Sequence, residues 1–286
     1  MERDYEYDLT PKDIAGKDVV FVKELGPANV HNPQQPRNFD EVESKLFPSL
    51  RATGFMKYGP ESKWDDRKYR LNKPFDGVKK IVVPLGLTHF GVYSADIERS
   101  NDVNRLIQSI GSFEFNDKWA YFSRVLCAMF IPITRDGFVF IGEKVSNNPY
   151  NGFLISAAGH VDYHGAPSFE NFQEQAINEL KEEYGKRLTL IGAPRFAGIA
   201  SHTFKGDANA VWVGRIDATQ EYFTSGKWLK ERKDAEHTAN LVKISTCHER
   251  NQLLNNLHLN GRDFPGIVYA TRLGLESLTD EDFQSL

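Results

Sequence analysis

The sequence predicts a mixed α/β protein in two units, and three observations support this prediction. A continuous apolar run at residues 124–133 is typical of a strand buried on both faces of a sheet. A turn and a returning apolar segment follow it at 135–144, as in a β-hairpin. Apolar residues then recur at helical spacing within residues 159–185. Strands that alternate with helical segments indicate an α/β fold.

The first unit, residues 1–117, is predicted to be a small α+β domain. Its apolar segments predict three strands, the last two around a turn at Gly86, and one helix; they lie at 18–22, 78–84, 89–93 and 102–110. Residues 54–74 are rich in turn formers and in both signs of charge. We interpret them as a solvated surface, although their lysines and arginines could attract phosphates. No motif indicates a chemistry here, so we expect this unit to dimerise, to cap an active site or to shape substrate choice.

The second unit, residues 118–286, continues with further strands and a helix after residue 185. They are predicted at 188–191, 195–202, 208–216, 241–244 and 249–259. In the third of these strands, Val211 and Val213 should lie on one face and Trp212 on the other, because side chains alternate along a strand. Near the end of the chain, Thr279 and Asp282 have the spacing of a helix cap.

Composition and charge exclude several classes of function. The net charge is −4, which argues against a broad nucleic-acid surface. Cys127 and Cys247 lie in apolar stretches, so we expect reduced thiols in a cytoplasmic protein. No apolar run reaches the roughly 18 residues of a membrane span. The first ten residues are too acidic and polar for a signal peptide.

Three glutamates gather beside the apolar stripe of the helix predicted within 159–185. On a helical wheel Glu179, Glu182 and Glu183 fall within about 100° of one another. The stripe consists of Phe169, Phe172, Ala176 and Leu180, with Ile177 and Tyr184 at its edge. Like charges at this spacing repel, and carboxylates at the margin of a core need a partner. Because hard divalent cations prefer carboxylate oxygens, the cluster predicts a Mg²⁺ site.

The stretch from Gly159 to Gly185 resembles the Nudix box, G-x5-E-x7-R-E-U-x-E-E-x-G-U, in which U is a bulky apolar residue. From Glu170 to Gly185 every fixed position matches but one, where Asn178 replaces arginine. Lys186 occupies the final apolar position. Gly159, taken as the opening glycine, lies eleven residues before Glu170 instead of six, so the loop carries five extra residues. The alternative is Gly165, which falls one residue from the regular spacing.

The resemblance implies a fold and a metal site. It implies an α/β/α sandwich around a mixed sheet at residues 118–286, preceded by the small α+β unit. It assigns Glu179, Glu182 and Glu183 to Mg²⁺ or Mn²⁺, with backbone carbonyls near Gly159 facing the metal. The base that takes a proton from water would be Glu179 or a loop glutamate, for which Glu236 is the first candidate.

The resemblance also implies an activity, the hydrolysis of a phosphoanhydride bond in a nucleoside diphosphate linked to another moiety. ADP-ribose and nucleotide sugars are the favoured substrates. We expect Lys144 and Arg195 to pair with phosphates, and Tyr163 and His164 in the lengthened loop to contact the substrate. The alternatives are a non-catalytic Nudix-fold sensor that binds a nucleotide, and an enzyme of transfer or isomerisation on a pyrophosphate-bearing substrate.

Overall fold

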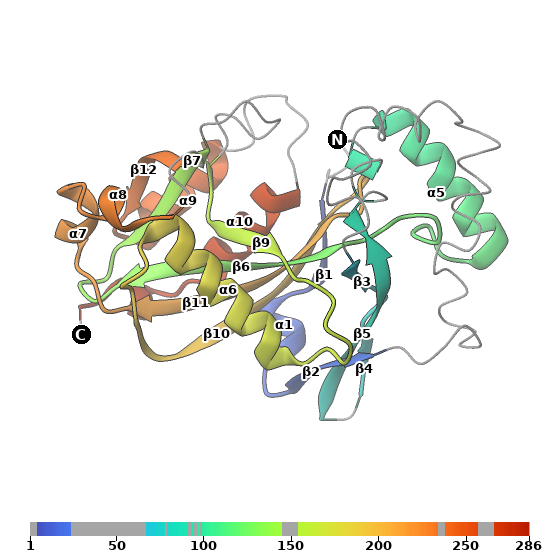
Figure 1. Cartoon of the computed structure of the whole chain (residues 1–286), viewed down its shortest axis with the longest axis horizontal. Coiled ribbons are helices and arrows are strands. Elements are labelled where there is room, and N and C mark those ends of the chain that lie inside the picture. Colours follow the sequence, from blue (N-terminus) through green and yellow to red (C-terminus); the bar gives the residue numbers. More distant parts are fainter. Residues whose placement is uncertain are drawn as a thin grey trace.

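The computed structural model describes residues 5–23, 67–77, 79–90, 93, 96–97, 99–144, 154–233, 238–256 and 266–285. One large mixed sheet has eight strands in these stretches, in the order β1-β10-β11-β6-β7-β12, with β8 paired to β7 and β9 to β6 (Figure 1). β6 and β11 are parallel, and the other pairs are antiparallel. The strands are β1 (Tyr5–Leu9), β6 (Leu126–Thr134), β7 (Val139–Lys144), β8 (Leu154–Ile155), β9 (Ala157–His160), β10 (Leu190–His202), β11 (Ala208–Ile216) and β12 (Thr238–Ile244).

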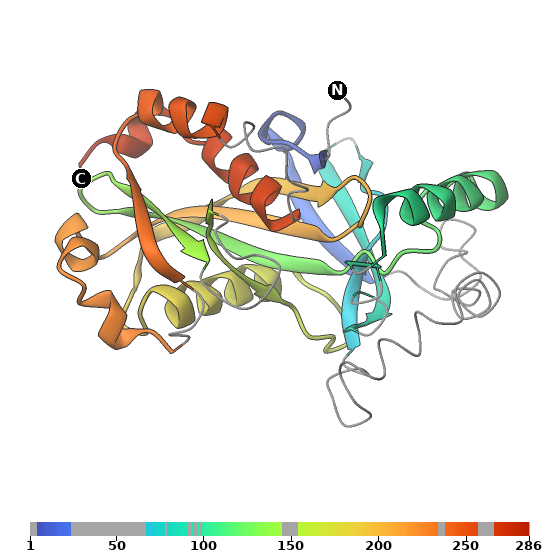
Figure 2. The ribbon, with the colours of Figure 1, turned by 90° about the horizontal axis from the view of Figure 1, so that it is seen from above.

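Helices cover both faces of the large sheet. α6 (Phe169–Tyr184) packs on one face, and α9 (Cys247–Asn256) and α10 (Gly266–Glu276) pack on the other. Figure 2 shows α6 in yellow and α10 in red on opposite sides of the strands. β6 is buried on both faces, because its even-numbered apolar residues face α6 and its odd-numbered ones from Met129 on face α10. The predicted α/β/α sandwich with a mixed sheet is therefore confirmed.

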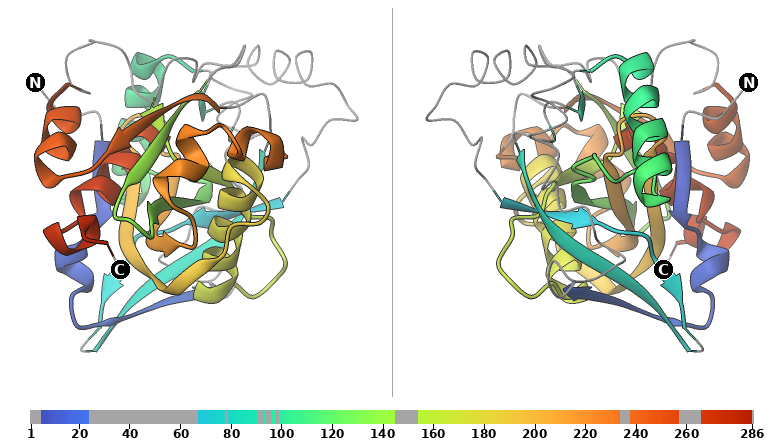
Figure 3. Two further views of the ribbon diagram at one scale, coloured as in Figure 1. Left: turned by 90° about the vertical axis from the view of Figure 1, so that its left-hand side faces the viewer. Right: turned by 90° about the vertical axis from the view of Figure 1, so that its right-hand side faces the viewer.

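A second sheet lies beside the first, at the end of the molecule that also carries α5 (Figure 3). Its order is β2-β5-β3, with β4 paired to β5; β2 and β5 are parallel, and the other pairs are antiparallel. The strands are β2 (Asp18–Lys23), β3 (Arg67–Leu71), β4 (Phe75–Asp76) and β5 (Lys80–His89), and the described residues of this part of the chain include the helices α1 (Pro11–Ile14) and α5 (Asn101–Phe115).

The predicted boundary after residue 117 is crossed by packing. β1 pairs with β10 of the large sheet, far along the chain. Phe21 and Tyr69 belong to the same buried hydrophobic cluster as Phe172 of α6. Residues on both sides of the predicted boundary thus share a strand ladder and a buried cluster, and the boundary at 117 stays a prediction.

The structure contradicts the prediction at two pairs of strands. β5 runs from Lys80 to His89, and the described residues Phe90 and Tyr93 beyond it are helical, so the predicted strand at 89–93 is wrong. The prediction of a turn at Gly86 is wrong, because Gly86 pairs with Arg70 of β3 in the middle of β5. β10 likewise runs without interruption from Leu190 to His202. Its ladder with β11 shifts register between Ile191 and Arg195 and again between Phe196 and Gly198, so the segments predicted at 188–191 and 195–202 belong to one irregular strand.

The remaining elements lie toward the end of the chain. They are α7 (Gln220–Thr224), α8 (Trp228–Glu231) and a 3₁₀ turn (Asp280–Phe283). The predicted cap is confirmed, because the Thr279 amide donates to Asp282 Oδ2 at 2.8 Å. As predicted, Trp212 faces the α6 side of the sheet and its two valine neighbours face the α10 side. Among the described helices, none is long and apolar enough to cross a membrane.

Candidate functional site

The helix α6 is defined at both ends by local signals. The Ser168 side chain accepts a hydrogen bond from the Asn171 amide at 3.1 Å and so caps the first turn. The helix ends at Gly185, whose φ of 140° is costly for any side-chain-bearing residue. A Cβ at this position would also overlap the Tyr222 hydroxyl. The last glycine of the box is thus required by conformation and by space.

The buried face of α6 is wider than the predicted stripe. Phe172, Ala176 and Leu180 are buried as expected. Tyr184, predicted at the edge, is fully buried, and its hydroxyl oxygen accepts a hydrogen bond from the Gly142 amide at 3.1 Å. This bond to β7 explains how the polar group can enter the core. Burial, followed by the negative charge of Glu183, raises the pKa of Tyr184, so the phenol stays neutral.

Gly159 lies in β9 and meets the carboxylate of Glu179. β9 pairs with β6 so that Gly159 stands opposite Ala128. A Cβ at residue 159 would overlap the carboxylate of Glu179, which the Gln175 amide holds through Oε1 at 2.7 Å. Nothing lies within 4 Å of a Cβ built at Gly165. Of the two candidate opening glycines, Gly159 is therefore the one that packs against the box glutamates.

Glu183 is the most deeply placed of the three glutamates. It is 5% exposed, and its Oε1 accepts a hydrogen bond from the Ala158 amide at 3.4 Å. Glu179 and Glu183 thus approach two consecutive residues of β9. Arg232 lies in the electrostatic field of Glu183, where burial lowers its pKa and the glutamate opposes that shift. The carboxylate at the margin of the core therefore has both an amide donor and a nearby positive charge.

Glu182 points to a different partner. Its Oε1 lies 2.8 Å from Lys233 Nζ, and the side chain is 38% exposed. The backbones also meet, because the Lys233 amide donates to the Glu182 carbonyl at 2.8 Å. In the part of the chain that the structure describes, no three Asp, Glu, His or Cys side chains are grouped closely enough to hold a metal ion. Each glutamate instead has its own polar partner, which keeps the like charges apart.

Two of the predicted substrate contacts lie in the loop between β9 and α6. The Tyr163 ring packs on the Tyr69 ring with centroids 5.0 Å apart. The His164 side chain is exposed, and its amide donates to the Tyr69 hydroxyl at 3.3 Å. Both residues are therefore held by β3. Their contact with a substrate stays a prediction.

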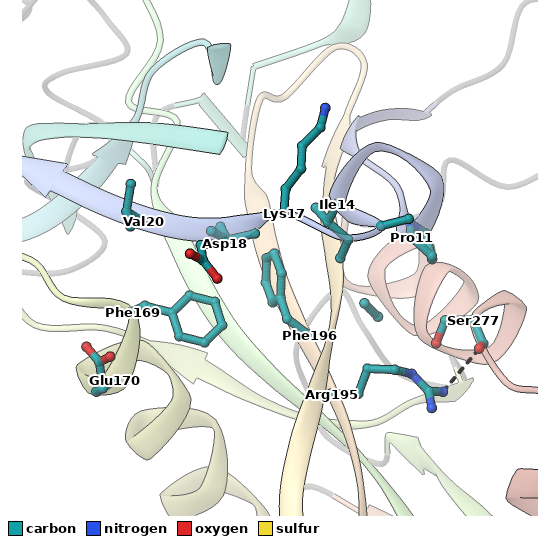
Figure 4. Close-up of a pocket in the computed structure, with 13 residues that line it drawn as sticks. Pro11, Ile14, Lys17, Asp18, Val20, Phe169, Glu170, Arg195, Phe196 and Ser277 are labelled. Carbon is teal, nitrogen blue, oxygen red and sulfur yellow. Dashed lines mark hydrogen bonds between the residues drawn. The ribbon is translucent and has the colours of Figure 1, made fainter. Parts of the chain in front are cut away.

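Arg195 lies near the start of α6, in a cleft of about 650 Å³ (Figure 4). Its guanidinium donates to the Ser277 carbonyl at 3.1 Å and to Asp282 at 3.0 Å. Phe169 and Glu170, the first residues of α6, line the same cleft. Glu179 lies ten residues further along the helix, about 15 Å at 1.5 Å per residue. The structure thus does not bring Arg195 to the glutamates, and its phosphate contact stays a prediction.

The structure describes only the backbone of Lys144 and nothing of Glu236, the other two predicted site residues. Lys144 is the last residue of β7 and stands opposite Thr238 of β12, but its side chain lies outside the described part of the structure. Glu236 lies outside the described residues altogether. The assignment of Glu236 as the base therefore stays a prediction.

Sequence reasoning missed two residues that hold the glutamates. Gln175 could have been found, because it precedes Glu179 by one helical turn and side chains at that spacing are neighbours. No sequence pattern indicated that Lys233 would contact a box glutamate, because it lies almost fifty residues after the box and follows a polar segment.

No family model matches the chain, and no curated protein sequence matches it. Solved structures do resemble it. A MutT Nudix hydrolase from Burkholderia pseudomallei is 17% identical with a TM-score of 0.34, over 54% of this chain and 97% of that one. An ADP compounds hydrolase is 17% identical with a TM-score of 0.36, over 53% and 70%. A Nudix hydrolase from Nitrosomonas europaea is 12% identical with a TM-score of 0.31, over 55% and 97%. By its own box, by the packing of Gly159 against Glu179 and by its layers, the chain resembles the Nudix hydrolase superfamily.

Proposed function

We propose that this protein is a Nudix-type pyrophosphohydrolase that uses Mg²⁺ or Mn²⁺. Its substrate would be a nucleoside diphosphate linked to another moiety, such as ADP-ribose or a nucleotide sugar. The observation that supports this most strongly is the approach of two box carboxylates to consecutive residues of β9. Glu179 fills the space left by the missing side chain of Gly159, and Glu183 accepts the Ala158 amide.

The oxygen donors of the box are of the type that suits a hard divalent cation, although among the described residues they are not grouped closely enough to hold one. Carboxylate and carbonyl oxygens are the donors that Mg²⁺ prefers. Glu179, Glu182 and Glu183 would hold the cation, together with a carbonyl near Gly159. A bound cation would neutralise negative charge on the pyrophosphate and lower the pKa of the attacking water. Lys233 competes for one of these ligands, since it pairs with Glu182 at 2.8 Å.

The reaction itself needs a proton acceptor and a fixed geometry. Water attacks a phosphorus atom, a new P–O bond forms, and the bond to the bridging oxygen breaks. Glu179 would accept the proton of the attacking water, and Glu236 is the alternative base. Gln175 holds Glu179 Oε1 at 2.7 Å, which limits the rotamers of the carboxylate. Such positioning can contribute much of the rate in hydrolysis of this kind.

A nucleotide panel tests the proposal. The protein is incubated with ADP-ribose, nucleotide sugars, dinucleotide cofactors and diadenosine polyphosphates, with Mg²⁺ or Mn²⁺, and release of the nucleoside monophosphate or of the other phosphorylated fragment is followed. Glu182→Gln and Glu183→Gln should lose most of the turnover. Glu174→Gln is the matched control, because Glu174 is an exposed glutamate of the same helix. Release from no member of the panel would refute the hydrolase, and unchanged turnover in both box variants would refute the metal assignment.

The second candidate function is a nucleotide sensor without catalysis. Two observations favour it: Asn178 replaces the arginine of the box, and Lys233 pairs with one of the three glutamates. A sensor would bind a nucleotide in calorimetry and leave it intact for hours. Turnover of the bound nucleotide would exclude this alternative.

A further inference from the structure

The second sheet contacts the box loop, residues 161–168, directly after the box glycine. Lys68 of β3 forms a backbone bridge with Asp162, and its Nζ makes an ion pair with the Asp162 carboxylate. The next amide, that of Tyr163, donates to the Arg67 carbonyl at 3.0 Å. β3 therefore lies alongside the loop and forms backbone contacts with the first residues of the loop.

Tyr69 connects the same loop to the box helix. Its ring lies 5.0 Å from the Tyr163 ring and 5.2 Å from the Phe172 ring of α6, measured between centroids. Its hydroxyl accepts the His164 amide at 3.3 Å. Tyr69 is 2% exposed, so these contacts lie inside the core. Burial raises the pKa of the phenol, which keeps it neutral.

His160, the residue after the box glycine, is held from the other side of the strand. Its ring lies 5.0 Å from the Tyr93 ring and 5.4 Å from the Phe90 ring, both edge to face. Both aromatic residues follow β5 of the second sheet. The contacts of His160 therefore restrain the last residue of β9, and those of Tyr163 restrain the loop that follows it.

We propose that β3 positions the box loop for catalysis, and that Lys68 is the positioning residue on which this depends. The inference rests on the proposed hydrolase function. The loop carries five more residues than the regular box, and a longer loop loses more conformational entropy when it is ordered. Contacts from the second sheet offset that loss and hold β9 where Gly159 meets Glu179. The N-terminal residues would thus act on turnover through the loop.

Lys68 is the best point at which to test this role. Its side chain is 7% exposed, whereas that of Asp162 is 61% exposed. Lys68→Met removes a buried ammonium, and the Asp162 carboxylate that loses this ion pair is mostly exposed to solvent. Asp162→Asn would do the reverse and leave a buried cation without this partner, which is far more disruptive. Lys68→Met therefore loosens the loop with the smaller cost to the fold.

The experiment combines hydrogen exchange with kinetics on the full chain. In Lys68→Met, amides of residues 160–168 should exchange faster while those in the middle of β6 remain protected. With the best nucleotide of the panel, kcat should fall about tenfold or more while KM changes less, because the loss is one of positioning. Lys68→Arg should restore both readouts, since it can still pair with Asp162. Lys80→Met, an exposed lysine on the neighbouring strand, is the control.

The outcomes separate this inference from the proposed function. An active wild-type protein whose Lys68→Met variant has unchanged loop exchange and unchanged kcat overturns the inference alone. Faster loop exchange with unchanged kcat also overturns it, because the contact would then be merely structural. A wild-type protein that hydrolyses no member of the panel refutes the hydrolase, and the positioning role falls with it.

Discussion

Replacement of Gly159 by alanine tests the central contact of the site. The new Cβ would overlap the Glu179 carboxylate, so the carboxylate must move away from β9. Overpacking of this kind costs about 1–3 kcal/mol. Loss of the 2.7 Å hydrogen bond from Gln175 adds about 1 kcal/mol. Alanine favours the strand by about 0.5–1 kcal/mol relative to glycine, which offsets part of the loss. The expected net destabilisation is about 1–3 kcal/mol.

The effect on turnover should exceed the effect on stability. Displacement of a catalytic carboxylate by about 1 Å can cost on the order of a hundredfold in rate. Urea denaturation measures the loss of stability, and release of the nucleoside monophosphate or of the other phosphorylated fragment under saturating substrate measures the loss of turnover. A second variant, Gly159→Ala combined with Glu179→Asp, shortens the side chain that the new methyl group meets. The double variant should be more stable than the sum of the single effects predicts.

A result of wild-type turnover in Gly159→Ala would falsify this reasoning. Additive stability changes in the double variant would also contradict it, because they would show that residues 159 and 179 do not compete for the same space. The stability comparison between the single and double variants is independent of which nucleotide is the substrate.

Two further predictions concern ion pairs. Burial alone would raise the pKa of Asp282, but hydrogen bonds from Arg195 and a backbone amide lower it below the ordinary 3.8. A carboxyl group whose pKa is lower in the folded state stabilises the fold above its unfolded pKa, and this stabilisation is lost as the pH falls through the folded-state pKa. Asp282→Asn should therefore lower Tm at about pH 6 and have a smaller effect near pH 3. Thermal unfolding at both values checks this, and an equal effect at both contradicts it. Lys233→Met removes the competitor of the cation at Glu182, so Mn²⁺ should bind about two- to fivefold more tightly in a paramagnetic titration. Unchanged affinity would exclude competition.

The parts of the fold that the sequence predicted are those with strong periodicity. The continuous apolar run became β6, whose residues are buried on both faces. The helical stripe ending in Leu180 became the buried side of α6. Both patterns are long enough for a period to be distinguished from chance. Short or charged segments lack such a signal, and most of the missed elements belong to this class.

β3 shows why charged segments are difficult to predict. We interpreted residues 54–74 as a solvated surface, but Lys68 and Arg70 within them are buried. Arg70 donates to the carbonyls of Phe122 and Trp119 at 3.1 and 2.7 Å, and Lys68 pairs with Asp162. These partners lie about fifty to ninety residues further along the chain. A lone sequence gives the charge of a side chain but not the groups that will neutralise it.

The sequence predicted the part of the candidate site whose residues are close together in the chain. The box places its glutamates on one helix, so their common position on α6 followed from the spacing, whereas the pairing of Glu182 with Lys233 did not. The choice between Gly159 and Gly165, and the separate position of Arg195, depended on contacts between distant segments. Arg195 follows a register shift in β10 and contacts Ser277 and Asp282, which lie more than eighty residues later in the chain.

β1, the first described strand, forms one edge of the large sheet. β1 covers β10, and its Asp8 carboxylate makes an ion pair of 2.7 Å with Arg124 in which both side chains are almost fully buried. A chain cleaved after residue 9 would expose the hydrogen-bonding groups of β10, and an open edge invites pairing with other chains. During synthesis β1 must wait for β10, nearly two hundred residues later, before it can pair. β1 is itself the outermost strand, so it replaces the long edge of β10 with a shorter edge of its own, and it can do so only after β10 has been made.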